Sequence, residues 1–225
     1  MAEAEGFLAI WSDIASDHET DYLHWLTREH TAERVGVPGF VGVRVFRARR
    51  EDVCRYFILY SLQNSLVVKS ETYVARLNAP TAWSRRIMPL LVNFVRGGGS
   101  VVAKVGLGQA SLISPLVFPA SAKEAIKVRL SSLCAIDRIV SARLFEVDEE
   151  ATTIRTNEKS IRTDDRSFAL LVILEALNHD ALQTGLANLE PTVEQDSQPV
   201  LYDQIFALDK RGISRTESQG YICAC

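Results

Sequence analysis

The chain has 225 residues, which is enough for one large domain or two small ones. Its formal net charge of -3 gives no electrostatic argument for binding nucleic acid or an anionic membrane surface. The N-terminal residues lack a basic region and an apolar run of signal-peptide length, and no stretch reaches the roughly 18 apolar residues of a membrane-spanning helix. We therefore expect a cytoplasmic protein with neither a membrane nor a nucleic-acid partner.

The first half of the chain is typical of a strand, a helix, two strands, a second helix and a strand. Val41, Val43 and Val45 alternate with other residue types, which predicts a half-buried strand. Pro80 and Pro89 predict breaks in the second helix, and the glycines at 97–99 predict a bulge in the last strand. The expected strands span 6–14, 40–47, 55–62 and 93–105, and the expected helices span 16–34 and 67–91.

The second half repeats this order of elements. The expected strands span 111–118, 138–147, 166–177 and 199–208, and the expected helices span 121–133 and 179–189. Pro115 lies inside the first of these strands, which predicts an edge strand or a bulge there. A polar stretch at 148–165 joins two of the strands, and the tail after residue 209 is expected to be loose.

Two sequence alignments indicate an internal duplication. The segment VGVRVF at 41–46 matches VSARLF at 140–145, and RYFILY at 55–60 matches RSFALL at 166–171. Each half has the β-α-β-β-α-β order of a ferredoxin-like unit, and two such sheets can bury each other face to face. We predict an α+β fold in which repeats at 1–108 and 109–210 form an α/β barrel with antiparallel sheets, followed by a tail at 211–225.

The cysteines and histidines give no sign of a metal site. The cysteines are few and irregularly spaced, which is typical of reduced thiols rather than of a disulfide framework. Cys223 and Cys225 form a Cys-X-Cys, but no second Cys/His pair faces it, and we expect a frayed tail. No two histidines have the spacing of zinc ligands, so we predict no metal.

The first predicted helix has an unusual mixture of residues on one face. At about 3.6 residues per turn, this face carries Tyr22, Trp25, Leu26, Glu29 and Glu33, with His30 on its edge. Burying charge costs several kcal/mol unless it is paired or neutralised, so the face must reach solvent or open into a pocket. The two carboxylates also lie near the negative end of the helix dipole, which raises a carboxylate's pKa and suits acid–base chemistry.

A motif spans this helix and its flanks: Trp11-Ser12-Asp13-Ile14, then Trp25-Leu26-Thr27-Arg28-Glu29-His30, Glu33-Arg34 and Pro38-Gly39-Phe40. In this motif the first half resembles the EthD-like branch of the dimeric α/β-barrel superfamily. Members of that superfamily use a cleft between sheet and helices, and most act on aromatic or otherwise apolar small molecules. The resemblance implies that Glu29 and His30 face the pocket and that Trp11, Asp13 and Trp25 lie nearby.

The second half departs from the motif. Its first helix contains KEAIKVRLSSL and carries no Glu-His pair, so the resemblance implies one competent pocket and one degenerate pocket. Members of the superfamily usually build the barrel from two chains of about half this length. A fused pair would form the barrel from one chain and could still assemble as a homodimer.

Each candidate residue has two interpretations. His30 is a proton-transfer group or a solvated histidine at a helix end, and Glu29 orients His30 or is an exposed charge. Asp13 hydrogen-bonds His30 or belongs to an ordinary turn. The substrate-binding candidates are the wall residues Trp11 and Trp25 and the phenolic donors Tyr56, Tyr60 and Tyr73, which are otherwise core residues.

These observations predict an enzyme that needs no cofactor. The expected activity is that of a lyase or isomerase acting on an aromatic or lactone-like catabolic intermediate, with His30, Glu29 and Asp13 as the catalytic residues. One alternative is an oxygen- or haem-using monooxygenase of the same superfamily, in which His30 or His179 would be the axial ligand of a haem. The other alternative is a non-catalytic barrel that binds a ligand. The expected partner in each case is an apolar or aromatic small molecule.

Overall fold

The computed structural model describes the chain except for residues 1–3, 52, 151–153, 163–164, 190–198 and 212–225. Eight strands close into one antiparallel barrel in the order β1-β3-β2-β8-β5-β7-β6-β4. The strands are β1 (Gly6–Ile14), β2 (Phe40–Ala48), β3 (Cys54–Leu62), β4 (Val92–Val105), β5 (Leu112–Phe118), β6 (Ile139–Val147), β7 (Leu170–Ala176) and β8 (Tyr202–Asp209). Cys223 and Cys225 lie outside the described residues.

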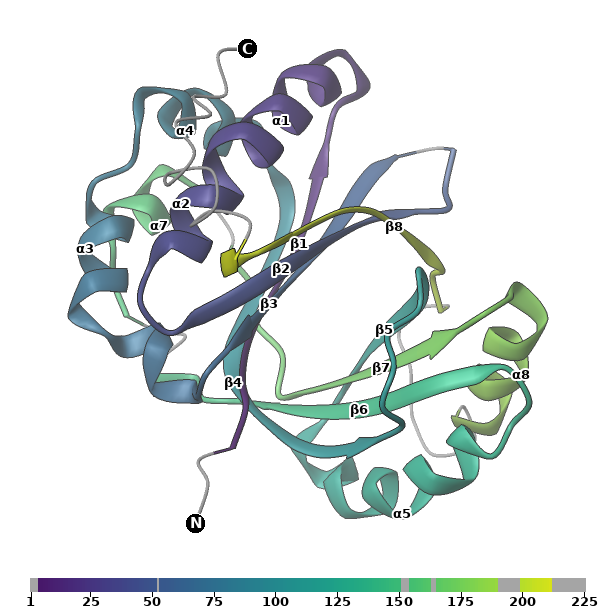
Figure 1. Cartoon of the computed structure of the whole chain (residues 1–225). Coiled ribbons are helices and arrows are strands. Elements are labelled where there is room, and N and C mark those ends of the chain that lie inside the picture. The colour runs from purple at the N-terminus through teal and green to yellow at the C-terminus, as the bar shows by residue number, and fades with distance from the viewer. Residues whose placement is uncertain (1–3, 52, 151–153, 163–164, 190–198, 212–225) are drawn as a thin grey trace.

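Helices cover the barrel on two opposite sides (Figure 1). The first side carries α1 (Glu19–Trp25), a π-helical turn (Leu26–His30), α2 (Thr31–Gly36), α3 (Glu71–Asn78) and α4 (Ala82–Ile87). The second side carries α5 (Lys123–Cys134) and α8 (His179–Leu189). The short helix α7 (Asn157–Ile161) comes from the second half of the sequence but packs against α3 on the first side. Among the described residues, none of the helices combines the length and hydrophobicity required to cross a bilayer.

The predicted fold class is confirmed: two β-α-β-β-α-β repeats together form the barrel. In each repeat the last strand pairs with the first strand of its own repeat and with the second strand of the other repeat, so β4 contacts β1 and β6 while β8 contacts β5 and β2. The interleaved pairing makes one closed sheet from both repeats. The repeat boundaries at 108 and 210 stay predictions.

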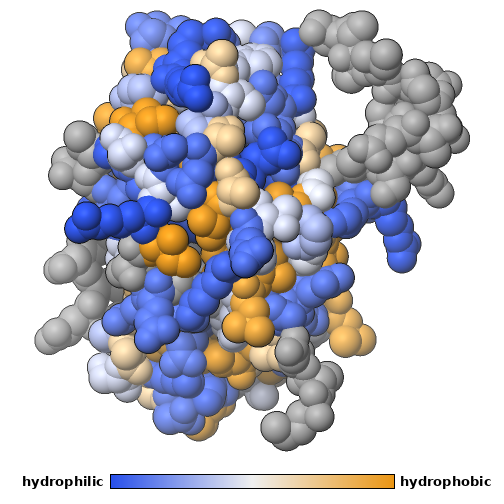
Figure 2. All heavy atoms as spheres, turned by 90° about the vertical axis from the view of Figure 1, so that its left-hand side faces the viewer, coloured by the Kyte–Doolittle hydropathy of each residue, from blue (hydrophilic) through white to orange (hydrophobic). Residues whose placement is uncertain are grey.

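The hydrophobic residues form three layers, one inside the barrel and one under each set of helices. Alternate residues of each strand point into the barrel or toward the helices, so most strands are buried on both faces. The expectation of a half-buried strand at 40–47 is therefore wrong, because closure of the barrel covers its second face. Outward-facing helix residues are mostly hydrophilic, and hydrophobic residues reach this surface only in scattered places (Figure 2).

The strand register tests the two internal alignments. Arg44 pairs with Leu59, and its counterpart Arg143 pairs with Ile173, which places Leu59 and Ile173 at equivalent positions. The segment equivalent to 55–60 is therefore 169–174, not the predicted 166–171. The first alignment is supported because the register irregularities at Phe40/Gly42 and at Ile139/Ser141 lie at equivalent positions. The second alignment is shifted by three residues, since Arg166 precedes the strand.

Proline and glycine act in different ways in the strands. β5 pairs with β7 over its whole length but with β8 at only two positions. Within the described ranges, the prediction of an edge strand at Pro115 is therefore confirmed from Ser114 onward. The glycines of β4 do not form the predicted bulge, because its register irregularities lie elsewhere. They allow close approach instead: a Cβ at Gly99 would lie 2.0 Å from the carbonyl oxygen of Glu146.

Candidate functional site

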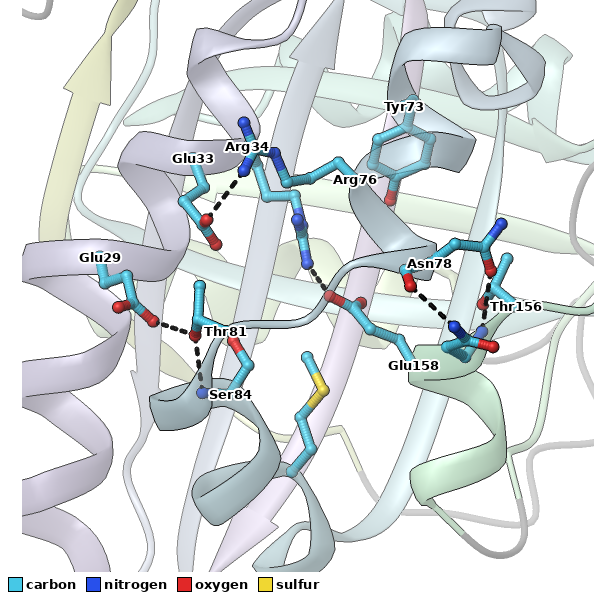
Figure 3. Close-up of polar contacts among 12 residues, drawn as sticks. Glu29, Glu33, Arg34, Tyr73, Arg76, Asn78, Thr81, Ser84, Thr156 and Glu158 are labelled. Carbon is cyan, nitrogen blue, oxygen red and sulfur yellow. Dashed lines mark hydrogen bonds and ion pairs between the residues drawn. The ribbon is translucent and has the colours of Figure 1, made fainter.

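A small cavity lies between the sheet of the first repeat and the helices that cover it. Its volume is about 40 Å³, enough for a few water molecules. Its floor is the outer face of β1, β3 and β4, and its walls are largely apolar and aromatic. The polar lining residues are Ser12, Tyr22, His30, Arg34, Tyr60, Tyr73, Arg96, Thr156, Glu158, Lys159 and Arg162. Residues of the α7 segment also line the cavity, so both halves of the sequence contribute to this site. Glu158 of α7 points toward Arg34 of α2 (Figure 3).

The π-helical turn decides which residues of the first helix face the cavity. The backbone N–H of Thr31 bonds to the carbonyl of Leu26, five residues back, which inserts one extra residue into the turn. One turn after Trp25, the residue that faces the sheet is therefore His30 rather than Glu29. One turn later it is Arg34 rather than Glu33. The expectation that Glu29 and Glu33 lie on the buried face with His30 at its edge is wrong for this reason. Single π turns of this kind are frequent at functional sites.

His30 is buried, with 6% of its surface exposed, and its Nδ1 has no hydrogen-bond partner. Its ring centroid lies 4.2 Å from that of Trp25. Burial, together with the nearby positive charges of Arg34 and Arg162, holds the pKa of His30 well below its usual value. The imidazole is therefore neutral near pH 7 and is open to a hydrogen-bonding ligand.

Glu29 and Glu33 lie at the outer rim of the helices. The Thr81 hydroxyl donates a hydrogen bond of 2.6 Å to Glu29 Oε1, and Thr81 also caps the N-terminus of α4 (Figure 3). Glu33 forms an ion pair of 3.2 Å with Arg76. Burial raises the pKa of Glu33, although it is only partly buried. Glu29 thus stabilises the contact between two helices and does not orient His30.

Asp13 and Trp11 point away from the cavity, into the barrel. Residues of β1 alternate between the two faces, so Ser12 lines the cavity while its neighbours Trp11 and Asp13 lie on the other side of the sheet. Asp13 accepts hydrogen bonds of 2.6 and 2.7 Å from Arg55 and one of 2.9 Å from Asn93. The predicted contact between Asp13 and His30 is therefore wrong, and so is the placement of Trp11 beside the cleft.

The remaining predicted aromatic residues divide into two groups. Trp25, Tyr60 and Tyr73 line the cavity, and the hydroxyl of Tyr60 is buried without a partner. Burial also raises the pKa of Tyr60 far above its usual value, so its phenol is a hydrogen-bond donor at neutral pH. Tyr56 lies outside the cavity and donates a hydrogen bond to Glu19.

Two buried arginines complete the site and were not predicted from the sequence. Arg34 forms an ion pair with Glu158, which joins α2 to α7 (Figure 3). Arg96, on β4, is 8% exposed and has one polar side-chain contact in the described part of the chain, to the Tyr73 hydroxyl at 3.4 Å. Arg34 is part of the Glu33-Arg34 motif, which was a usable signal. Nothing around Arg96 in the sequence predicts that its side chain lines a cavity.

The cavity does not suit a haem. Its volume of about 40 Å³ is far below the roughly 300–1,000 Å³ of sites that hold larger ligands. His179, the other predicted axial ligand, contacts Arg49 on the far side of the barrel, where its Nε2 accepts a hydrogen bond of 2.5 Å. Among the described residues there is also no group of three or more His, Cys, Asp or Glu side chains that could hold a metal ion.

Comparisons with known proteins give the fold. No protein-family model matches the chain, and no curated protein matches its sequence. It is similar in structure to a protein from Fusobacterium nucleatum subsp. nucleatum assigned as a monooxygenase, with a TM-score of 0.57, 10% identity, and coverage of 93% of this chain and 96% of that one. An anthrone oxidase-like protein gives a TM-score of 0.57 with 6% identity, covering 92% and 94% of the two chains. Chlorite dismutase from Candidatus Nitrospira defluvii gives a TM-score of 0.51 with 8% identity, covering 94% of each chain. At these identities the likeness establishes a shared α/β-barrel fold.

Proposed function

We propose that the chain is a small-molecule enzyme that removes a proton from an apolar, aromatic substrate in the cavity of the first repeat. The observation that carries the proposal is the buried, neutral His30, whose Nδ1 is unpartnered beside an apolar cavity. A buried polar atom without a partner costs about 1–3 kcal/mol in stability, which a folded protein offsets when a ligand uses that atom.

The charges around His30 favour an anionic product of proton transfer. Arg34, Arg96, Lys159 and Arg162 line the cavity. Arg34 pairs with Glu158 and Arg162 pairs with Asp165, whereas Arg96 has no carboxylate partner in the described part of the chain. A phenol or an enolisable carbonyl compound would lose its proton to His30 and become an anion beside Arg96. The imidazolium and the new anion then attract each other, which compensates for the low basicity of His30. Tyr60 would donate a hydrogen bond to the same oxygen.

We favour molecular oxygen as the second reactant, which the anion reduces. An electron-rich aromatic anion can reduce oxygen directly, so no cofactor is required for such a monooxygenase. The shared fold with proteins named as a monooxygenase and an anthrone oxidase-like protein supports this choice. A lyase or isomerase acting on an aromatic or lactone-like compound is the second candidate, because its reaction starts with the same proton transfer. Turnover under oxygen-free conditions distinguishes them: it stops for the oxygenase and continues for the lyase or isomerase.

The motif in the first repeat supports a relationship with the EthD-like branch, and we propose that relationship. We also propose a cytoplasmic location. The Glu of its Glu-His pair has a structural contact here, so we assign the proton transfer to His30 alone. One chain closes the barrel by itself, and a homodimer would therefore form on the outer surface. Size-exclusion chromatography with light scattering tests this assembly.

Substrate binding requires the α7 segment to move. An engineered cavity of about 150 Å³ binds a molecule as small as benzene, whereas the present volume is about 40 Å³. The segment is held by two hydrogen bonds between Asn157 and Asn78 and by the ion pair of Glu158 with Arg34 (Figure 3). Ile161 also packs against the core, and the guanidinium group of Arg162 lies over the ring of Phe94. We propose that these contacts break and re-form during turnover, as the contacts of a lid do.

The test compares His30→Gln with His24→Gln. His24 is exposed and lies on the same helix, so it is a matched control. With an aromatic substrate found by screening phenols and enolisable ketones for oxygen uptake, His30→Gln should lower kcat by about 10²–10⁴-fold. His24→Gln should leave kcat unchanged. Unaltered turnover in His30→Gln, with the circular dichroism spectrum preserved, would remove His30 from the mechanism.

A further inference from the structure

A second, larger hollow opens where the barrel is incompletely closed. Its volume is about 860 Å³, and it is separated from the first cavity by the sheet. In the first repeat, β1 pairs with β4 from Gly6 to Asp13. The equivalent pairing of β5 with β8 in the second repeat stops after Leu112 and Ile113. The rest of β5 and residues 199–201, which precede β8, therefore line an opening into the barrel.

The floor of this hollow is aromatic. Trp11 packs between Phe57 and Phe168, with ring centroids 4.5 and 5.4 Å from its own, and it is only partly buried. Tyr202 lies in the same interior layer. A partly exposed tryptophan at the base of a concave surface can stack with a flat ligand.

The rim of the hollow is basic. Four arginines line it, namely Arg49, Arg50, Arg55 and Arg166, and no carboxylate lines it among the residues that the structure describes. Asp203 pairs with Arg49, and Asp13 pairs with Arg55, from behind the lining surface. The side chain of Arg166 is exposed and forms no ion pair or hydrogen bond in the described part of the chain. Guanidinium groups bind carboxylates and related anions through paired hydrogen bonds.

We propose that this hollow binds a small molecule with a flat aromatic body and an anionic group such as a carboxylate. The aromatic body stacks on Trp11 inside the barrel, and the anionic group contacts Arg166 at the rim. Neither the cavity beside His30 nor its proton transfer is needed for this site. The loss of strand pairing at Pro115 therefore opens a binding site that both repeats line, on the opposite face of the sheet from the first cavity.

The experiment compares a matched pair of ligands, naphthalene-1-carboxylate and naphthalene-1-methanol, by isothermal titration calorimetry on the full chain. The carboxylate should bind at least about tenfold more tightly than the alcohol, because only the carboxylate pairs with the arginines. Arg166→Glu should weaken binding of the carboxylate by at least about tenfold and leave the alcohol unaffected. The control variant Arg85→Glu makes the same charge change on exposed α4 and should bind the carboxylate as the unmodified protein does.

Two further variants show whether the ligand binds in this hollow or in the cavity of the first repeat. Binding should quench tryptophan fluorescence in the unmodified protein, and Trp11→Phe should remove most of the quenching. Arg96→Leu alters only the cavity of the first repeat and should leave binding of the carboxylate unchanged. The proposal is overturned if the carboxylate does not bind at millimolar concentration, if Arg166→Glu binds it normally, or if Arg96→Leu abolishes binding.

Discussion

The helical layers of the two repeats bury different kinds of residue under the same topology. In the first layer, the face of the leading helix toward the sheet carries Trp25, His30 and Arg34 beside a cavity. In the second layer, α5 presents Ile126, Leu130 and Leu133 to hydrophobic residues of the sheet and of α8. Buried polar side-chain atoms without partners occur in the first layer and inside the barrel, but not in the second layer, as far as the structure describes the chain.

This difference indicates how a duplicated fold divides its tasks. A packed apolar layer gains free energy from burial, whereas buried polar groups without partners cost it. Natural proteins accept such costs where a site needs them. The second layer can stabilise the closed barrel while the first keeps a set of polar groups that lack some of their hydrogen bonds. Loss of a polar contact in the first layer and of an apolar contact in the second should therefore have different consequences.

The largest expected effect is on the ion pair of the first layer. Arg34→Met leaves Glu158 buried without its partner, which should lower the free energy of unfolding by about 3–5 kcal/mol. Urea titration measures the loss. The double variant Arg34→Met with Glu158→Gln removes the unpaired charge and should recover a large part of that loss. A single variant as stable as the unmodified chain would show that the pair contributes no coupling between α2 and α7.

A smaller effect distinguishes the apolar parts of the two layers. Leu130→Ala removes a side chain that is 1% exposed in the packed second layer and should cost about 2–5 kcal/mol. Leu77→Ala removes a side chain of the first layer that is 9% exposed and already lines a cavity, and should cost at most about 2 kcal/mol. Equal losses in urea titrations would mean that the first layer is packed as tightly as the second.

The sequence predicted the barrel because its information is local and repeated. The proline breaks and the match between Arg44 and Arg143 follow from short segments, and the structure agrees with them. The half-buried alternation expected at 40–47 failed because closure of the barrel is not a local property. The helix at 157–161 was missed because its five residues, NEKSI, carry no apolar period. It is held by contacts with α3 and with Arg34, which lie far away in the sequence.

The candidate site was predicted in part. The cavity of the first repeat is lined, as predicted, by His30, Trp25, Tyr60 and Tyr73. The predicted set of residues on one face of the helix was wrong, because an ideal helical period cannot reveal a π turn. Asp13 was misplaced because strand alternation was not applied to it. Pairing of Arg34 with Glu158 joins residues 124 positions apart, and no local pattern encodes it.

The pH dependence of stability gives a further test of the first layer. Because the pKa of His30 is lowered in the folded chain, the unfolded chain binds a proton first as the pH falls below about 6.5. The unmodified protein should therefore lose about 1.4 kcal/mol of stability per pH unit between pH 6.5 and the lower pKa of folded His30, relative to His30→Gln. Urea titrations of both proteins at pH 7.5 and 5.5 measure the difference, and parallel pH profiles would mean that His30 is solvated.

The smallest effect is expected where the two layers meet solvent. Asp21 pairs with Arg86 on the first side and Glu124 pairs with Lys127 on the second, and both carboxylates are at least partly exposed. Water and salt screen such pairs, so Asp21→Ala and Glu124→Ala should each leave the urea midpoint unchanged within error. If Asp21→Ala alone were destabilising, the asymmetry between the repeats would extend to their surfaces and could not be assigned to the buried layer. If both variants were as stable as the unmodified protein, the asymmetry between the repeats would be confined to the residues around His30 and to the apolar cluster beneath α5.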